Sequence, residues 1–148
     1  MPEEEILTSE QVLQVPYNYS AGPVASRFLL GLRDEQRIYG IKCESCNTVY
    51  CPPRSVCGRC FLSLSEWVEV GPEGVLASFT KVSYHEDVHP RTPLVLGLIK
   101  PDGADTALTH LVLDKPEGLK PGDRVRAVFA EERSGHILDL VGFERVGG

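Results

Sequence analysis

The chain has 148 residues, of which 42% are hydrophobic, so it is large enough to bury the core of one domain or of two small modules. Its net charge of −6 argues against a nucleic-acid partner, because such proteins normally carry a basic domain or stripe. The acidic start, Met-Pro-Glu-Glu-Glu, does not resemble a signal peptide, and the apolar run at residues 94–99 is too short to span a membrane. We therefore expect a soluble cytoplasmic protein without a membrane partner.

Residues 1–16 form an acidic N-terminal segment whose sequence pattern allows two structures. Thr8 and Gln11 have capping-box spacing ahead of Val12 and Leu13, which favours a helical turn ended by Pro16. The other interpretation is a disordered tail.

A helix is predicted from residue 24 to residue 36. Gly22-Pro23 supplies an N-cap and a proline at the first helical position. Apolar side chains gather on one face of this helix, whereas Leu30 lies among arginines on the other side. A helix that docks on a partner and a helix packed on its own domain both explain this pattern. In the docking interpretation, the partner-binding residues are Val24, Phe28, Leu29, Leu30 and Leu32.

Four of the five cysteines form two Cys-x-x-Cys pairs, Cys43/Cys46 and Cys57/Cys60, with ten residues between the pairs. Two such turns can bring four thiolates to one tetrahedral ion, and a closed structural zinc site is the commonest use of this pattern. Disulfides would require an oxidising compartment, and a rubredoxin-like iron site uses the same spacing. We favour one structural zinc ion per chain. Cys51 has no base or helix N-terminus beside it, so it is predicted to be a small buried residue.

Short strand patterns flank both cysteine pairs, at residues 37–42, 48–51 and 67–70. Pro52-Pro53 ends the second strand, because proline cannot donate to a ladder. This order is that of a zinc ribbon, whose small core obtains much of its folding free energy from the metal. We assign the ribbon to residues 37–70, after a tail and docking helix at residues 1–36.

Residues 71–148 alternate strand patterns with good turn sequences such as Asp102-Gly103 and Ser134-Gly135. The candidate strands are 75–84, 94–100, 106–113, 124–130 and 137–146. Five strands in so short a segment predict a small closed barrel, and an OB-fold is favoured over an SH3-like barrel. The predicted fold class is therefore mainly β: an N-terminal helix, a zinc ribbon and a C-terminal five-stranded OB-fold barrel.

The segment between the first two barrel strands contains His85, His89 and Arg91. Two histidines four residues apart could bind a metal on a helix, but Pro90 and Pro93 disfavour a helix here. We expect a solvated loop, in a position that OB-folds often use for recognition.

This combination resembles the rubredoxin-like zinc-ribbon/OB-fold proteins associated with acyl-CoA metabolism. The resemblance spans about residues 17–146, and Cys51 departs from it where an apolar residue is expected. The matching motifs are Ser26-Arg27-Phe28, Cys43-x-x-Cys46-x-x-Val49-Tyr50-x-Pro52-Pro53-Arg54, Cys57-x-x-Cys60 and Pro121-Gly122-Asp123-x-Val125.

The resemblance implies a non-catalytic subunit that forms a hetero-oligomer with a thiolase or a thiolase-like aldolase. Members of the family help to form the acyl-CoA site, so acyl-CoA at the shared interface is also implied. Thiolase chemistry needs an activated cysteine, and the residues agree with an accessory role because four of the five cysteines are assigned to the metal. Two other classes stay open at this point: a zinc-ribbon/OB-fold module that binds nucleic acid, and an iron-containing electron carrier.

Overall fold

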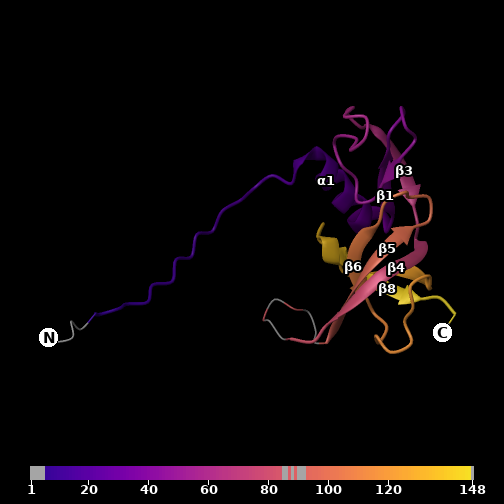
Figure 1. Cartoon of the computed structure of the whole chain (residues 1–148). Coiled ribbons are helices and arrows are strands. Elements are labelled where there is room, and N and C mark those ends of the chain that lie inside the picture. The colour runs from indigo at the N-terminus through magenta and orange to yellow at the C-terminus, as the bar shows by residue number, and fades with distance from the viewer. Residues whose placement is uncertain (1–5, 85–86, 88, 90–92, 148) are drawn as a thin grey trace.

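The computed structural model describes residues 6–84, 87, 89 and 93–147, and the fold is mainly β, as predicted. A helix and a small sheet lie at one end of the molecule, and a barrel lies at the other (Figure 1). The elements of the first part are α1 (Gly22–Leu30), the π-helical turn η1 (Gly31–Glu35), β1 (Ile38–Lys42), β2 (Val49–Tyr50) and β3 (Glu66–Val70). Those of the barrel are β4 (Glu73–Val82), β5 (Leu94–Pro101), β6 (Leu108–Val112), β7 (Arg124–Phe129), the 3-10 turn η2 (Ile137–Asp139) and β8 (Leu140–Arg145).

Residues 6–21 form an extended tail that contains neither helix nor strand (Figure 1). The helical turn that the sequence allows before Pro16 does not form. A single turn fixes several backbone angles for few hydrogen bonds, and the tail side chains are exposed, so no packing offsets that cost.

The predicted helix forms as α1 followed by η1, and it ends at Gln36 in a left-handed conformation (φ 54°). Phe28 is 5% exposed and Leu32 is fully buried, both in a core that the helix shares with β1 and the barrel. The apolar surface of these two side chains is therefore already covered within the chain. Leu29 packs partly against the same core, whereas Leu30 is 42% exposed.

The ribbon, by which we mean β1–β3 and the two cysteine turns, contains the sheet order β2-β1-β3 with antiparallel pairing. Ile41 of β1 is opposite Tyr50 of β2 and Trp67 of β3. Ile41 and Tyr50 are buried in a small cluster with Cys43 and Cys57, which is separate from the main core. The ribbon core is thus built directly against the cysteine side chains.

The barrel strands in the described part of the chain close in the order β4-β5-β6-β8-β7, which matches the predicted five-stranded OB-fold. The parallel pairing of its third and fifth strands, β6 and β8, occurs at Val112 and Phe143. Val125 and Ala127 face the core, whereas Arg124 and Arg126 face outward, as their alternation predicts.

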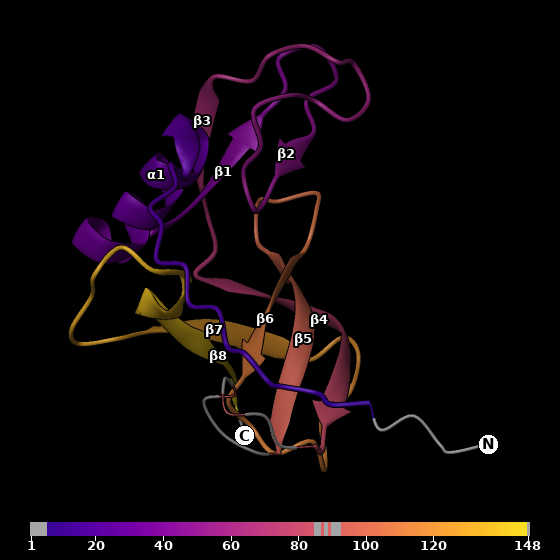
Figure 2. The same ribbon diagram turned by 90° about the vertical axis from the view of Figure 1, so that its left-hand side faces the viewer.

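The barrel and the ribbon are joined by hydrogen bonds as well as by the shared core. The loop between β5 and β6 reaches β2 (Figure 2), where the Asp105 carboxylate accepts the Val49 N–H at 2.8 Å. The Asp105 N–H donates to the Val49 carbonyl at 2.9 Å. The domain boundaries at residues 36/37 and 70/71 stay a prediction, and one core spans both of them.

The two-sided apolar run at residues 94–99 is largely covered within the chain. The buried residues of this run include Leu94, Val95 and Ile99. Leu98, on the outer face of the barrel, is exposed. No helix among the described residues is long and apolar enough to cross a membrane.

Replacing Phe28 with alanine should lower the free energy of unfolding by about 3–5 kcal/mol, because it leaves a cavity in the core shared by helix and barrel. The matched change Leu30→Ala removes an exposed side chain and should lower the free energy of unfolding by about 0.5 kcal/mol or less. Urea unfolding of the metal-loaded chain measures both values. Equal costs for the two variants would contradict the packing described here.

Candidate metal centre

The first cysteine turn begins where β1 ends. The Cys43 carbonyl accepts the Asn47 N–H at 2.7 Å, and the Cys43 N–H donates to the Thr48 carbonyl at 2.9 Å. Closing this loop requires a left-handed residue after Cys46, and Asn47 adopts φ 58° there. Asparagine tolerates this conformation better than most residues, so the local sequence favours the turn.

The second cysteine turn repeats the hydrogen bonds of the first. The Cys57 carbonyl accepts the Phe61 N–H at 3.1 Å, and the Cys57 N–H donates to the Leu62 carbonyl at 2.9 Å. Here the left-handed position is occupied by Phe61 (φ 58°), whose side chain is 81% exposed. A bulky residue in this region is strained, and no burial of its ring offsets that strain.

The two turns bring all four predicted cysteines together, and their sulfur atoms lie within 4.8 Å of one another. The Cys46 and Cys57 sulfurs are 3.7 Å apart. Sulfurs around a tetrahedral zinc ion, with Zn–S bonds of about 2.3 Å, would be separated by about 3.8 Å. A disulfide requires about 2.05 Å, and all five cysteines, each within the described residues, are free. The arrangement therefore fits a four-sulfur metal site.

Tyr50 and Thr48 support the sulfurs from β2 and the turn that precedes it, and the sequence analysis did not identify either role. The Tyr50 hydroxyl lies 3.3 Å from the Cys57 sulfur and accepts the Gly58 N–H at 3.2 Å. The Thr48 hydroxyl lies 3.2 Å from the Cys46 sulfur and lowers the pKa of that thiol. These contacts depend on how the hairpin folds back on itself, so no spacing rule predicts them.

The cysteines differ in their acidity before any metal binds. The Tyr50 hydroxyl, helped by the backbone N–H groups of Cys60 and Arg59, lowers the pKa of Cys57 to about 6. For Cys60 the largest single influence is a hydrogen bond with Ser45, which lowers the pKa. The other three sulfurs and burial together outweigh it and raise the pKa to about 11. Four thiolates so close together need a cation to neutralise them, so the donor set itself favours a divalent ion.

Cys51 is not part of this cluster. It is fully buried in the main core directly after β2, and burial raises the pKa of its thiol to about 12. The prediction that Cys51 is a small buried residue is confirmed. Its thiol is protonated at neutral pH and cannot act as a nucleophile without rearrangement.

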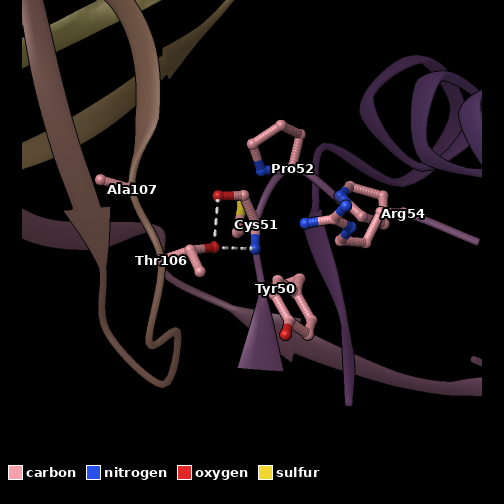
Figure 3. Close-up of a pocket in the computed structure, with 7 residues that line it drawn as sticks. Tyr50, Cys51, Pro52, Arg54, Thr106 and Ala107 are labelled. Atoms are coloured by element: carbon pink, nitrogen blue, oxygen red, sulfur yellow. Dashed lines mark hydrogen bonds between the residues drawn. The ribbon is translucent and has the colours of Figure 1, made fainter. Parts of the chain in front are cut away.

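A cleft of about 390 Å³ lies beside Cys51, between the ribbon and the barrel (Figure 3). The Thr106 hydroxyl fixes one wall, since it accepts the Cys51 N–H at 2.8 Å and donates to the Cys51 carbonyl at 3.0 Å. Arg54 contributes a positive charge to the cleft, and its guanidinium lies 5.3 Å from the centre of the Tyr50 ring.

The predicted recognition loop is only partly described. His85 and Arg91 lie outside the described residues. His89 is half-buried, with its ring 5.3 Å from that of Tyr84. Both rings line an apolar groove of about 370 Å³ on the outer wall of the barrel, together with side chains of β5, β6 and η2.

Comparison with known proteins agrees with this architecture. Residues 31–64 match the family model described as the ChsH2 rubredoxin-like zinc ribbon domain, and residues 67–130 match the ChsH2 C-terminal OB-fold domain. The two models follow one another along the chain and together cover about two thirds of it. The chain belongs to this family of ChsH2-type zinc-ribbon/OB-fold proteins, as its motifs predicted.

Individual proteins are similar to this chain in sequence or in fold. A DUF35 domain-containing scaffold protein of Methanocaldococcus jannaschii is 28% identical over 101 residues, which are 66% of this chain and 71% of the relative. The solved structure of an Ltp2-ChsH2(DUF35) aldolase aligns with a TM-score of 0.66 at 16% identity, covering 86% of this chain and 98% of the other. A DUF35-family crystal structure from Sulfolobus solfataricus, of unknown function, aligns with a TM-score of 0.63 at 22% identity, covering 84% of each chain. These structural matches support the fold.

Replacing Cys57 with alanine should abolish tight binding of one metal ion per chain, because a closed site with three sulfurs cannot complete its tetrahedron. Cys51→Ala is the matched control, and it should keep one ion per chain because this side chain lies outside the cluster. Metal analysis of the purified variants measures both results. Loss of the metal in Cys51→Ala would show that the ligands are wrongly assigned.

Phe61→Asn should stabilise the metal-loaded chain by about 1 kcal/mol, because asparagine tolerates the left-handed conformation and the lost ring is exposed. Leu62→Asn also removes an exposed apolar side chain from this turn, but at a residue not in that conformation, so it should bring no such gain. Thermal unfolding at fixed metal concentration compares the two. A lower midpoint for Phe61→Asn would mean that the strain account is incorrect.

Proposed function

We propose that this chain is a non-catalytic subunit that holds one structural zinc ion and forms a complex with a thiolase-type acyl-CoA enzyme. The accessory role is supported by the positions of the five cysteines. Four of them converge on one point, and the fifth is buried with its pKa raised to about 12. A thiolase needs an activated cysteine that is free to attack its substrate. Cys57 is the acidic thiol here, but it belongs to the four-sulfur site, and Cys51 is buried with a raised pKa.

The choice of zinc rests on the closed four-sulfur geometry, which is the usual form of a structural zinc site. Zinc would fix the two cysteine turns relative to each other and so complete the ribbon core around Ile41 and Tyr50. The metal analysis described above also tests the ion: we expect about one zinc and little iron per chain. A coloured, iron-containing chain would favour the electron-carrier class instead.

The choice of partner rests on the family and on its relatives. The M. jannaschii relative is described as a scaffold protein, and the solved ChsH2 structure is that of an aldolase with Ltp2. We propose the same kind of assembly here, with a thiolase or a thiolase-like aldolase as the catalytic subunit and acyl-CoA bound at the shared interface. The cleft beside Arg54 is a suitable place for an anionic part of such a ligand.

The motifs also resemble those of the zinc-ribbon subunit of benzoylsuccinyl-CoA thiolase, from anaerobic toluene degradation. We propose benzoylsuccinyl-CoA as the first substrate to test with the assembled complex. Relatives that act in sterol breakdown, in polyketide-like acylation or in archaeal mevalonate synthesis define the other substrates for comparison.

The competing nucleic-acid class finds little support in the charges of the barrel. Arg124 forms ion pairs with Asp102 at 2.5 Å and with Glu73 at 3.1 Å, and Arg126 also pairs with Glu73. These arginines are therefore neutralised by neighbouring carboxylates. A single-strand-binding face would instead present unpaired basic groups beside stacked aromatic rings.

We propose that the outer side of α1 contacts the catalytic subunit. Leu30 is exposed there, and it lines a shallow hollow with Leu29, Arg33 and the loop at Ser134-Gly135. Val24 is half-buried near the start of the helix. Phe28 and Leu32 would act indirectly, because they anchor the helix to the barrel from its inner side.

Leu30→Glu should disrupt the complex, because it places an unpaired charge in the proposed contact while leaving the zinc site and the barrel intact. Val146→Glu is the matched control: Val146 is 41% exposed and lies just beyond the end of β8. Size-exclusion chromatography of each variant, co-expressed with the thiolase-type subunit, measures the result.

We expect the wild type and Val146→Glu to co-elute with the partner and Leu30→Glu to elute separately. Thiolase activity should be absent from this chain alone and reduced in the Leu30→Glu mixture. If Leu30→Glu still co-elutes at full stoichiometry and activity, the helix is not the docking element.

A further inference from the structure

The exposed tail before α1 has the side-chain pattern of a β-strand. Between residues 13 and 19 every second side chain is apolar or aromatic, and the residues between them are Gln14, Pro16 and Asn18. Strict alternation of this kind places one kind of side chain on each face of an extended chain. The members of the apolar face are Leu13, Val15, Tyr17 and Tyr19.

This apolar face is uncovered. Its four side chains are between 61% and 87% exposed, and Figure 1 shows the tail projecting away from the folded body. The Tyr17 and Tyr19 rings lie 6.1 Å apart, as expected for neighbours on the same side of an extended segment. Large apolar surfaces left in water usually mark a site of contact with another molecule.

Pro16 restricts how such a strand can pair. Backbone N–H and C=O groups point alternately to the two edges of a strand, so those of residues 13, 15, 17 and 19 share one edge. Pro16 lies on the opposite edge and has no N–H to donate, which confines the segment to the outside of a sheet. The edge that carries the odd-numbered residues is complete and can pair with a neighbouring strand.

We infer that residues 13–19 add as an extended edge strand to a sheet of the catalytic partner, with Leu13, Val15, Tyr17 and Tyr19 in an apolar groove beside that edge. This inference rests on the proposed function and extends the contact made by α1, since the tail runs directly into that helix at Gly22. Glu10 lies just before the segment, and Glu3, Glu4 and Glu5 precede it in the sequence. The partner surface should therefore be basic where the strand begins.

The inference is tested with two neighbouring substitutions of the same charge. Val15→Asp places a carboxylate in the apolar face, whereas Gln14→Asp places it on the opposite face. We expect Val15→Asp to weaken binding to the purified thiolase-type subunit by at least about tenfold, and Gln14→Asp to change it by less than about threefold. Zinc content and the urea unfolding curve should stay those of the wild type, since both positions lie outside the folded core.

Residue-resolved hydrogen exchange of the complex supplies a second measurement. Pairing along one edge should protect the backbone amides of the odd-numbered residues 13, 15, 17 and 19 and leave those of Gln14 and Asn18 in exchange. Uniform protection, or none, would contradict strand addition even if the tail contributes to affinity.

The possible results distinguish a failure of this inference from a failure of the proposed function on which it rests. If the wild-type chain fails to bind the thiolase-type subunit, the proposed function fails and the inference falls with it. If the wild type binds and Val15→Asp binds equally well, or if both aspartate variants weaken binding alike, only the tail inference is overturned. If the chain alone is dimeric and Val15→Asp makes it monomeric, the tail pairs with a second copy rather than with the catalytic subunit.

Discussion

The structure depends most on the convergence of four cysteine sulfurs between two short turns. Each turn is closed by the same pair of backbone hydrogen bonds, so each presents its sulfurs in the same way. The ribbon core contains little besides Ile41, Tyr50, Leu64 and the cysteines themselves, and so small a core cannot provide much folding free energy. A metal ion at this point would neutralise the crowded thiolates and supply folding free energy that the small apolar core lacks.

The ribbon then fixes the geometry of the rest of the chain. Asp105 of the barrel loop bonds Val49 of β2, and Thr106 bonds Cys51 directly after that strand. Strand β1 begins with Ile38 in the core that Phe28 shares with the barrel. Helix, ribbon and barrel are therefore parts of one packed unit rather than modules on linkers.

Much of this could be predicted from the sequence, because the signals were local. The spacing of the cysteine pairs was enough to place four sulfurs together, and alternation with turn residues located all five barrel strands within a few residues. Phe61 could also have been identified, since Asn47 marks the equivalent left-handed position in the first turn. The features that the sequence did not predict depend on tertiary contacts. The helical pattern could not decide whether Phe28 and Leu32 face a partner or the chain's own barrel, and no pattern revealed that Tyr50 supports Cys57 or that Thr106 holds Cys51.

The central claim is that one metal ion bound by four cysteine sulfurs organises the chain. X-ray absorption spectroscopy at the zinc edge of the purified protein tests it most directly, because it counts the ligands and measures their distances. The account predicts a single shell of four sulfurs at about 2.3 Å. A shell that includes nitrogen or oxygen ligands, or one with fewer than four sulfurs, would contradict it.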